Sequence, residues 1–210
     1  MIIEALAMVT DLANFLINGF LVSIQLYAVL NPLSVIPTFA SLTEAWSQDQ
    51  KRHAVRKASL IVLLLMTIFC FLGDPLLKLL NVSIASLRFG GGILLMVIAV
   101  DMLSGMSRTK SLESMDEALI VPIATPLLVG PGTITTLIVL SVSEGFATTM
   151  LGVVIATVLV FVTLSSGELL LEKAGKNFVR SLGRFMAIII AGISGEMIHK
   201  ALLEWGIASK

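Results

Sequence analysis

The chain has 210 residues, of which 57% are hydrophobic and 13% charged, and its mean hydropathy is +1.00. Acidic and basic residues balance at 14 each, and they cluster between long apolar stretches instead of forming a basic face. This composition excludes an ordinary soluble domain, a coiled coil and a nucleic-acid-binding protein, and it indicates a protein whose solvent is the lipid bilayer.

Six apolar stretches follow one another along the chain, and a helix needs about 20 residues to cross the hydrocarbon core. They are Ile17–Thr43, Ala58–Phe71, Ser83–Leu103, Ala118–Ser143, Phe146–Gly167 and Phe185–Leu203. The second is the shortest, but Val55 before it and Leu76–Leu80 after it can lengthen it. Because lipid offers no hydrogen bonds to the backbone, we expect an all-α membrane protein with six transmembrane helices, forming a single domain over residues 1–210.

Basic residues are placed unevenly along the connections between these stretches. Ten of the 14 lie after the first, third and fifth stretches: Lys51, Arg52, Arg56, Lys57, Arg108, Lys110, Lys173, Lys176, Arg180 and Arg184. Connections rich in Lys and Arg stay in the cytoplasm. The charge pattern therefore predicts a multi-pass protein with both termini on the outer side of the membrane.

An internal repeat relates the first three stretches, about residues 14–104, to the last three, about residues 116–204. The aligned pairs are Asn31 with Gly130, Pro32 with Pro131, Ser34 with Thr133, and Asp101 with Glu196. Since each repeat has three helices, the two repeats must enter the membrane from opposite faces. This is the inverted-repeat plan of many secondary transporters.

Each repeat begins with a stretch that is interrupted near its middle. Proline inside a helix costs about 3 kcal/mol, but it suits the first position of a new helix. Asn31-Pro32 therefore predicts an N-cap followed by a first-turn proline, and Gly130-Pro131-Gly132 predicts the same device with flanking glycines. We expect helices 1 and 4 to be discontinuous inside the membrane.

The breaks have a predicted chemistry of their own. A half-helix that starts inside the membrane presents free N–H groups and a partial positive charge, which suit an anionic group. The preceding half-helices should end in free carbonyls near Val29-Leu30 and Leu128-Val129, which suit an ammonium group or a cation. With neutral side chains around the breaks, the pattern favours an amino acid over a multiply charged solute. The candidate substrate-binding residues are Asn31, Pro32, Ser34, Gly130, Pro131, Gly132, Thr133 and Thr135.

Ionisable residues inside apolar stretches are costly in lipid and usually functional. Glu196 lies deep in the sixth stretch, with His199 one turn later to share a proton, and is the first candidate for proton coupling. Asp101, its repeat counterpart, is the second, although Asp101 and Arg88 can also be explained as side chains that extend to an interface. The glycines of Gly90–Gly92 and Gly192–Gly195 indicate close helix packing.

Three segments resemble the MarC family of bacterial and archaeal inner-membrane proteins: Asn31–Phe39, Leu87–Ile93 and Val121–Ile134. The resemblance implies a location in the inner membrane. It also implies transport of small neutral amino acids such as glycine and alanine, coupled to protons, as described for archaeal relatives. Serine at position 34, where the family often has glycine, would narrow the first break and alter substrate choice.

Alternatives to a proton-coupled amino-acid carrier remain at this point. An exporter of amino acids or toxic solutes fits the same residues, and so does a non-transporting membrane protein of this family, which is named for antibiotic resistance. An enzyme is disfavoured, because no nucleophile and base pair and no His, Cys and Asp cluster stand in the apolar stretches. We expect no cofactor and no metal; the expected partners are the substrate, protons and lipid, and the oligomeric state does not follow from the sequence.

Overall fold

The computed structural model describes residues 2–104 and 128–208, and these two ranges contain helices and no strand. The helices are α1 (Ile2–Leu30), α2 (Pro32–Leu42), α3 (Gln48–Leu80), α4 (Ile84–Ser104), α6 (Pro131–Ser143), α7 (Phe146–Ser165) and α8 (Gly167–Glu204). Within the described ranges, α1, α3, α4, α7 and α8 are long and apolar enough to cross a membrane, whereas α2 and α6 are shorter apolar helices. The chain is an all-α integral membrane protein.

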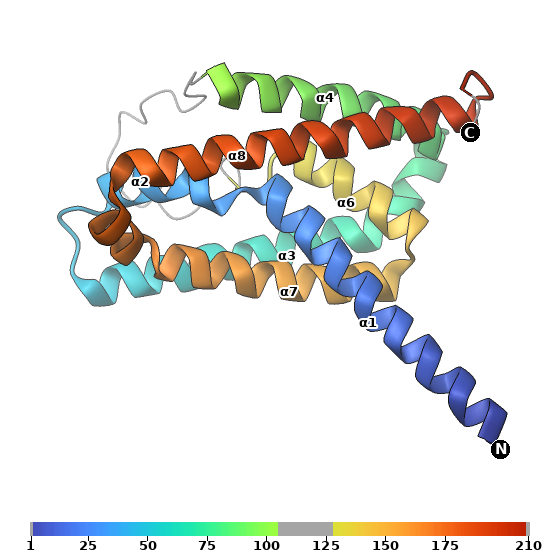
Figure 1. Cartoon of the computed structure of the whole chain (residues 1–210), viewed down its shortest axis with the longest axis horizontal. Coiled ribbons are helices and arrows are strands. Elements are labelled where there is room, and N and C mark those ends of the chain that lie inside the picture. The colour runs from blue at the N-terminus through green and yellow to red at the C-terminus, as the bar shows by residue number, and fades with distance from the viewer. Residues whose placement is uncertain (1, 105–127, 209–210) are drawn as a thin grey trace.

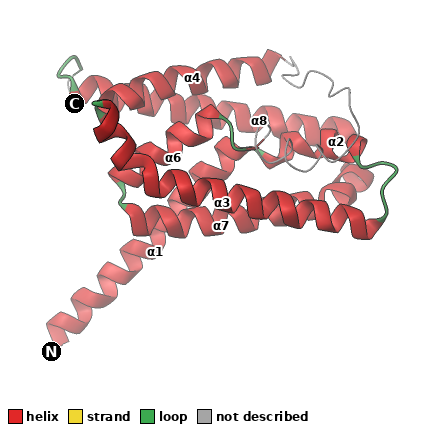
Figure 2. Cartoon of the chain, turned by 180° about the vertical axis from the view of Figure 1, so that it is seen from behind, coloured by secondary structure: helices red, strands yellow, loops and turns green. Residues whose placement is uncertain are grey.

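The helices lie alongside one another in a bundle, from which the first half of α1 projects (Figure 1). Both termini lie toward the same end of this bundle, and the α2–α3 and α7–α8 connections lie at the other end (Figures 1 and 2). The predicted basic connection with Arg108 and Lys110, and the first part of the fourth stretch, fall outside the described residues.

The first helix begins earlier than its apolar stretch, which was predicted to start at Ile17. α1 starts at Ile2, and its apolar part Ala7–Leu30 is by itself long enough to cross a membrane. The charges that limited the prediction do not limit the helix, because acidic residues near a helix N-terminus are favourable and no glycine or proline precedes Gly19.

The second and sixth helices also extend beyond their predicted stretches. α3 adds ten residues before Ala58, and its start is fixed by a capping box in which Ser47 and Gln50 bond reciprocally. α8 begins at Gly167 instead of Phe185, and Gly175, at φ 81°, divides it by a kink. A hydropathy pattern ends each stretch where charged residues begin. Those charged residues still favour helix, so the helix continues beyond the apolar stretch.

The ends of the other described helices agree closely with prediction. α4 matches the stretch Ser83–Leu103 within one residue at each end, and α7 starts at Phe146 as expected. α6 ends at Ser143, the predicted end of the fourth stretch. Glycine, proline and clustered polar residues stop these helices, so their ends can be read locally.

Close contacts in the centre of the bundle depend on glycine. α4 packs along α8 and against α6, and a Cβ placed on Gly92 would lie 2.6 Å from the Ile198 Cγ1 and 3.0 Å from the Ser194 carbonyl oxygen. The Ser194 hydroxyl donates to the Gly92 carbonyl over 2.6 Å. By contrast, a Cβ on Gly90 would meet nothing within 4 Å. The predicted packing role of this glycine run is confirmed for Gly92 and not for Gly90.

Candidate functional site

The first break separates α1 from α2 at Asn31. This residue has φ 45° and ψ 57°, in the left-handed region, and Pro32 occupies the first turn of α2 as predicted. The Asn31 N–H donates to the Tyr27 carbonyl, which closes α1. The Asn31 side chain does not cap α2, so the first turn of that helix has no side-chain cap.

The Asn31 side chain is buried, with 4% of its surface exposed. Its Nδ2 donates to the Met102 sulfur of α4 over 3.6 Å. Its Oδ1 has no hydrogen-bond partner among the described residues. A buried acceptor without a partner costs about 1–3 kcal/mol, so this oxygen is the feature of the break that packing alone does not explain.

The second break precedes α6. Gly130 is its N-cap in an extended conformation, with φ −86° and ψ 177°, and again no side chain caps the helix. Nothing in the described residues lies within 4 Å of a Cβ placed on Gly130, whereas one placed on Gly132 would lie 2.8 Å from Leu95 Cδ2 of α4. Pro131 is in the first turn and exposed. Among the described residues nothing therefore fills the space at Gly130, and Gly132 serves packing.

The hydroxyls near the breaks bond to the backbone of their own segments. Thr133 donates to the Leu128 carbonyl over 3.0 Å, so the prediction that this carbonyl is free is wrong. Thr135 and Thr136 donate to carbonyls one turn earlier on α6. The exposed Ser34 donates to the Asn31 carbonyl over 2.9 Å. These oxygens can still accept hydrogen bonds, since each hydroxyl keeps acceptor capacity.

The fold brings the two breaks to one hydrophobic core. Leu30 and Val35, on either side of the first break, and Leu128 and Val129, before the second, belong to the same cluster of buried residues. Thr133 is 2% exposed, which is comparable to Asn31. Asn31 and Thr133 are thus buried in this conformation, whereas the neighbouring candidates Ser34 and Pro131 are exposed.

A polar cavity of about 310 Å³ lies at the end of the bundle where the termini lie, and we call it the terminal cavity. Gln25 of α1, Arg88 of α4, Glu144 after α6 and Glu196 of α8 contribute to its lining. Glu196 forms an ion pair of 3.4 Å with Lys200, one turn later, and more than half of each side chain is exposed. The predicted partner was His199, but a residue four positions on lies nearer the same helix face.

The second proton-coupling candidate, Asp101, lies in the last turns of α4 and is partly buried. Its neighbour Met102 contacts Asn31, so this end of α4 lies beside the first break. Glu196 and Asp101 thus occupy different surroundings, one in the terminal cavity and the other near the break.

The sequence is similar to those of known membrane proteins. The model of the MarC family of integral membrane proteins matches residues 14–206. The chain belongs to the MarC family. It is 30% identical to a UPF0056 membrane protein of Methanocaldococcus jannaschii, with 83% of this chain and 90% of the relative covered. The UPF0056 membrane protein YvbG of Bacillus subtilis is 30% identical over 90% of this chain and 94% of its own. The UPF0056 inner membrane protein YhgN of Escherichia coli is also 30% identical, over 87% and 95%. No solved structure matches.

In this MarC protein, the interaction that sequence reasoning missed is the ion pair between Arg88 and Glu204. It joins the first turns of α4 to the last turn of α8 at the terminal cavity, and 12% and 35% of the two side chains are exposed. The sequence offered an interfacial position for Arg88, and the structure adds Glu204 as its partner. The sequence clue was a single arginine inside an apolar stretch. Such a charge usually needs a carboxylate partner, but the sequence does not say which one.

Loss of this pair should destabilise the MarC fold. We expect Arg88→Gln to lower the free energy of unfolding by roughly 1–2 kcal/mol, less than the about 3–5 kcal/mol of a fully buried pair, because a third of Glu204 is exposed. The charge swap Arg88→Glu with Glu204→Arg should restore most of it. Thermal unfolding in detergent measures both. Lys200→Gln, which breaks a more exposed pair, is the control; an equal loss there would show that the Arg88 pair has no special weight.

Proposed function

We propose that this protein is a secondary transporter of small neutral amino acids such as glycine and alanine, coupled to protons, and that substrate binds between the two breaks. The observation that carries the proposal is the unpartnered Oδ1 of Asn31, buried at a break whose repeat counterpart stands at Gly130. Proteins rarely keep such an acceptor unless a ligand or water completes it.

The chemistry at the breaks is complementary to a zwitterion. The uncapped first turns of α2 and α6 suit a carboxylate, through their N–H groups and the positive ends of their dipoles. The Asn31 Oδ1 suits an ammonium group as acceptor. None of the described residues fills the space beside Gly130, which could admit a small side chain, and the residues that form the two breaks are themselves uncharged.

Helix contacts support the proposed arrangement as two inverted three-helix repeats. α2 packs on α8 and α6 packs on α4, so the second half of each broken helix contacts the third helix of the opposite repeat. α3 contacts α6, and α7 contacts α2, which are again equivalent pairs. Two other large contacts, α4 with α8 and α3 with α7, each join equivalent helices. These pairs fit an exchange of the two repeats, whereas the extensive contact of α1 with α7 has no counterpart among the described helices.

Access to the proposed site would alternate by rocking one repeat against the other. Asn31 and Thr133 are both buried, so helix movement would have to expose these two side chains. Protonation of Glu196 would neutralise the carboxylate that pairs with Lys200 in the terminal cavity and so weaken a contact on that side. Glu196 is thus the proposed proton carrier, with Asp101 as the second candidate.

The proposed location is the inner membrane, with both termini and the terminal cavity on the outer side. Support comes from the positions of Lys51, Arg52, Lys173 and Lys176, all near connections at the opposite end of the bundle from the termini (Figure 1). Such basic connections face the cytoplasm.

Counterflow in proteoliposomes tests the proposal directly. Proteoliposomes that contain the purified protein and are loaded with unlabelled glycine or alanine should accumulate the radiolabelled amino acid from outside. In separate uptake measurements, an inwardly directed proton gradient should accelerate net uptake several-fold. Glu196→Gln should keep counterflow and lose the response to the gradient, because exchange of bound substrate needs no net proton movement. Glu172→Gln, an exposed carboxylate earlier on α8, should behave as the wild type.

Each of the other possible results would point to a different function. Counterflow without any gradient response in the wild type would remove Glu196 from its proposed role. Flux of toxic solutes but not of amino acids would identify the alternative exporter. Absence of flux for a broad panel of metabolites, with folded protein in the vesicles, would favour a membrane protein that does not transport.

A further inference from the structure

A second cavity, of about 350 Å³, lies at the end of the bundle opposite the termini, between α2, α3, α7 and α8. We call it the basic cavity, because its charged lining consists of Lys51, Arg52, Arg56 and Glu168. It shares no lining residue with the terminal cavity and contains neither break. Nothing in the proposed transport mechanism uses it.

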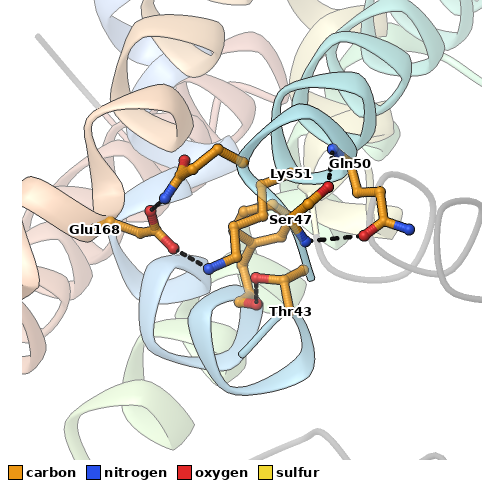
Figure 3. A network of polar contacts seen from close by, with 7 residues as sticks. Thr43, Ser47, Gln50, Lys51 and Glu168 are labelled. Atoms are coloured by element: carbon orange, nitrogen blue, oxygen red, sulfur yellow. Dashed lines mark hydrogen bonds and ion pairs between the residues drawn. The ribbon is translucent and has the colours of Figure 1, made fainter. Parts of the chain in front are cut away.

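The single carboxylate of this lining is already occupied. Glu168 accepts hydrogen bonds from the Lys51 ammonium group and, over 2.9 Å, from the Gln48 side-chain amide, and Figure 3 shows the Lys51 and Glu168 side chains turned toward each other. Arg52 and Arg56 stand four residues apart, on one face of α3, and neither forms an ion pair within the described residues. The lining therefore carries two guanidinium groups in excess of its carboxylate.

The helix turn that carries the first cation of this lining, Lys51, is fixed before any ligand binds. The capping box of Ser47 and Gln50 holds the first turn of α3, and Lys51 follows directly, with only 15% of its side chain exposed (Figure 3). The N-terminus of α3 adds its partial positive charge to that of the side chains.

Apart from Gln48 and Ser165, the remaining lining of the basic cavity is apolar. Phe39 and Leu164 are buried, whereas Phe161 on α7 is 38% exposed and faces outward from the bundle. A ligand that fills this cavity must be anionic at one end and apolar at the other. Inorganic phosphate meets only the first condition, and an anionic phospholipid meets both, since its phosphate continues into apolar chains that can cover Phe161.

We propose that the basic cavity binds the headgroup phosphate of an anionic phospholipid, through the guanidinium groups of Arg52 and Arg56. Basic pockets between transmembrane helices bind anionic headgroups in this way, and arginine holds phosphate in a bidentate fashion. Bound lipid would join α3 to α7 and α8 at this end of the bundle. The site is independent of the transported solute, so transport could fail its own test without affecting it.

The test uses the whole purified chain in detergent and three probes at equal concentration: phosphatidylglycerol, phosphatidylcholine with the same acyl chains, and inorganic phosphate. Phosphatidylglycerol should raise the thermal unfolding midpoint in a saturable way, and the other two should not. Arg52→Gln with Arg56→Gln should weaken phosphatidylglycerol binding by roughly tenfold or more. Both arginines are exposed and form no ion pair with another described residue, so the doubly substituted protein should fold; its midpoint without lipid verifies this.

The matched control is Arg180→Gln with Arg184→Gln. These arginines are also exposed, also four residues apart and toward the same end of the bundle, but they do not line the basic cavity. Their loss should change binding less than twofold. An equal loss in both pairs would overturn the site in favour of general surface charge. An equal effect of phosphatidylcholine would overturn the preference for anionic lipid, and an equal effect of inorganic phosphate would overturn lipid as the ligand.

Discussion

Asn31→Gly is expected to reduce uptake of the transported amino acid at least tenfold while leaving thermal stability unchanged or slightly raised. Glycine accepts the left-handed backbone at this position, where φ is 45°, so the break itself is preserved. What is lost is the side chain, whose Oδ1 is a buried acceptor without a partner among the described residues. Removing an unsatisfied buried group relieves a cost, so stability and uptake should change in different directions.

The chain offers a matched control for this substitution. Asn31 and Asn81 are the non-glycine residues with positive φ in the described ranges, and Asn81, at φ 53°, ends α3 far from either break in sequence. Asn81→Gly makes the same chemical change in the same backbone conformation and should leave uptake within about twofold. Proteoliposome uptake and a thermal midpoint measure both substitutions. Normal uptake by the Asn31→Gly protein would discard the proposed site.

The backbone of the two breaks could be predicted because its causes are local. Proline suits the first turn of a helix, Asn31 adopts the left-handed conformation that ends α1, and Gly130 precedes α6 in an extended conformation. Proline alone is not enough, since Pro37 and Pro75 lie inside α2 and α3. The structure places Pro32 and Pro131 in the first turns of α2 and α6 as expected. The breaks follow from the dihedral preferences of single residues and from the missing N–H group of proline. Both properties can be read directly from the sequence.

The side-chain partners at the breaks could not be predicted, because they depend on contacts between separate helices or on competition within a turn. Nothing in the sequence indicates that the Asn31 amide donates to Met102, 71 residues away. The Leu128 carbonyl was predicted to be free because a helix end leaves carbonyls unpaired, but the Thr133 hydroxyl satisfies it. Such details decide which atoms remain for a ligand.

The ion pairs also differ in whether they could be predicted from the sequence. The bond between Lys51 and Glu168 and the pair of Arg88 with Glu204 both join distant segments, and neither follows from helical spacing. The pair of Glu196 with Lys200 spans one turn and could have been read from the sequence. Hydropathy, in turn, located the apolar cores of the helices but underestimated α1 and α8, whose charged turns continue as helix.

Gly92→Ala is expected to lower the free energy of unfolding by about 1–3 kcal/mol, the usual cost of an overpacked contact. The added Cβ would lie 2.6 Å from Ile198 Cγ1 and 3.0 Å from the Ser194 carbonyl oxygen, so α4 and α8 must move apart. That movement would also lengthen the hydrogen bond from the Ser194 hydroxyl to the Gly92 carbonyl. The thermal unfolding midpoint in detergent measures the loss.

Gly90→Ala separates packing from helix propensity in the same experiment. A Cβ on Gly90 meets nothing within 4 Å, and alanine is the better helix former by about 0.8–1.0 kcal/mol, so this substitution should be neutral or stabilising. Two identical changes, two residues apart on α4, should therefore have opposite signs. If both destabilise equally, the close approach of α4 and α8 is not what requires glycine. If only Gly92→Ala does, the close contact of α4 with α8 is what requires glycine at position 92.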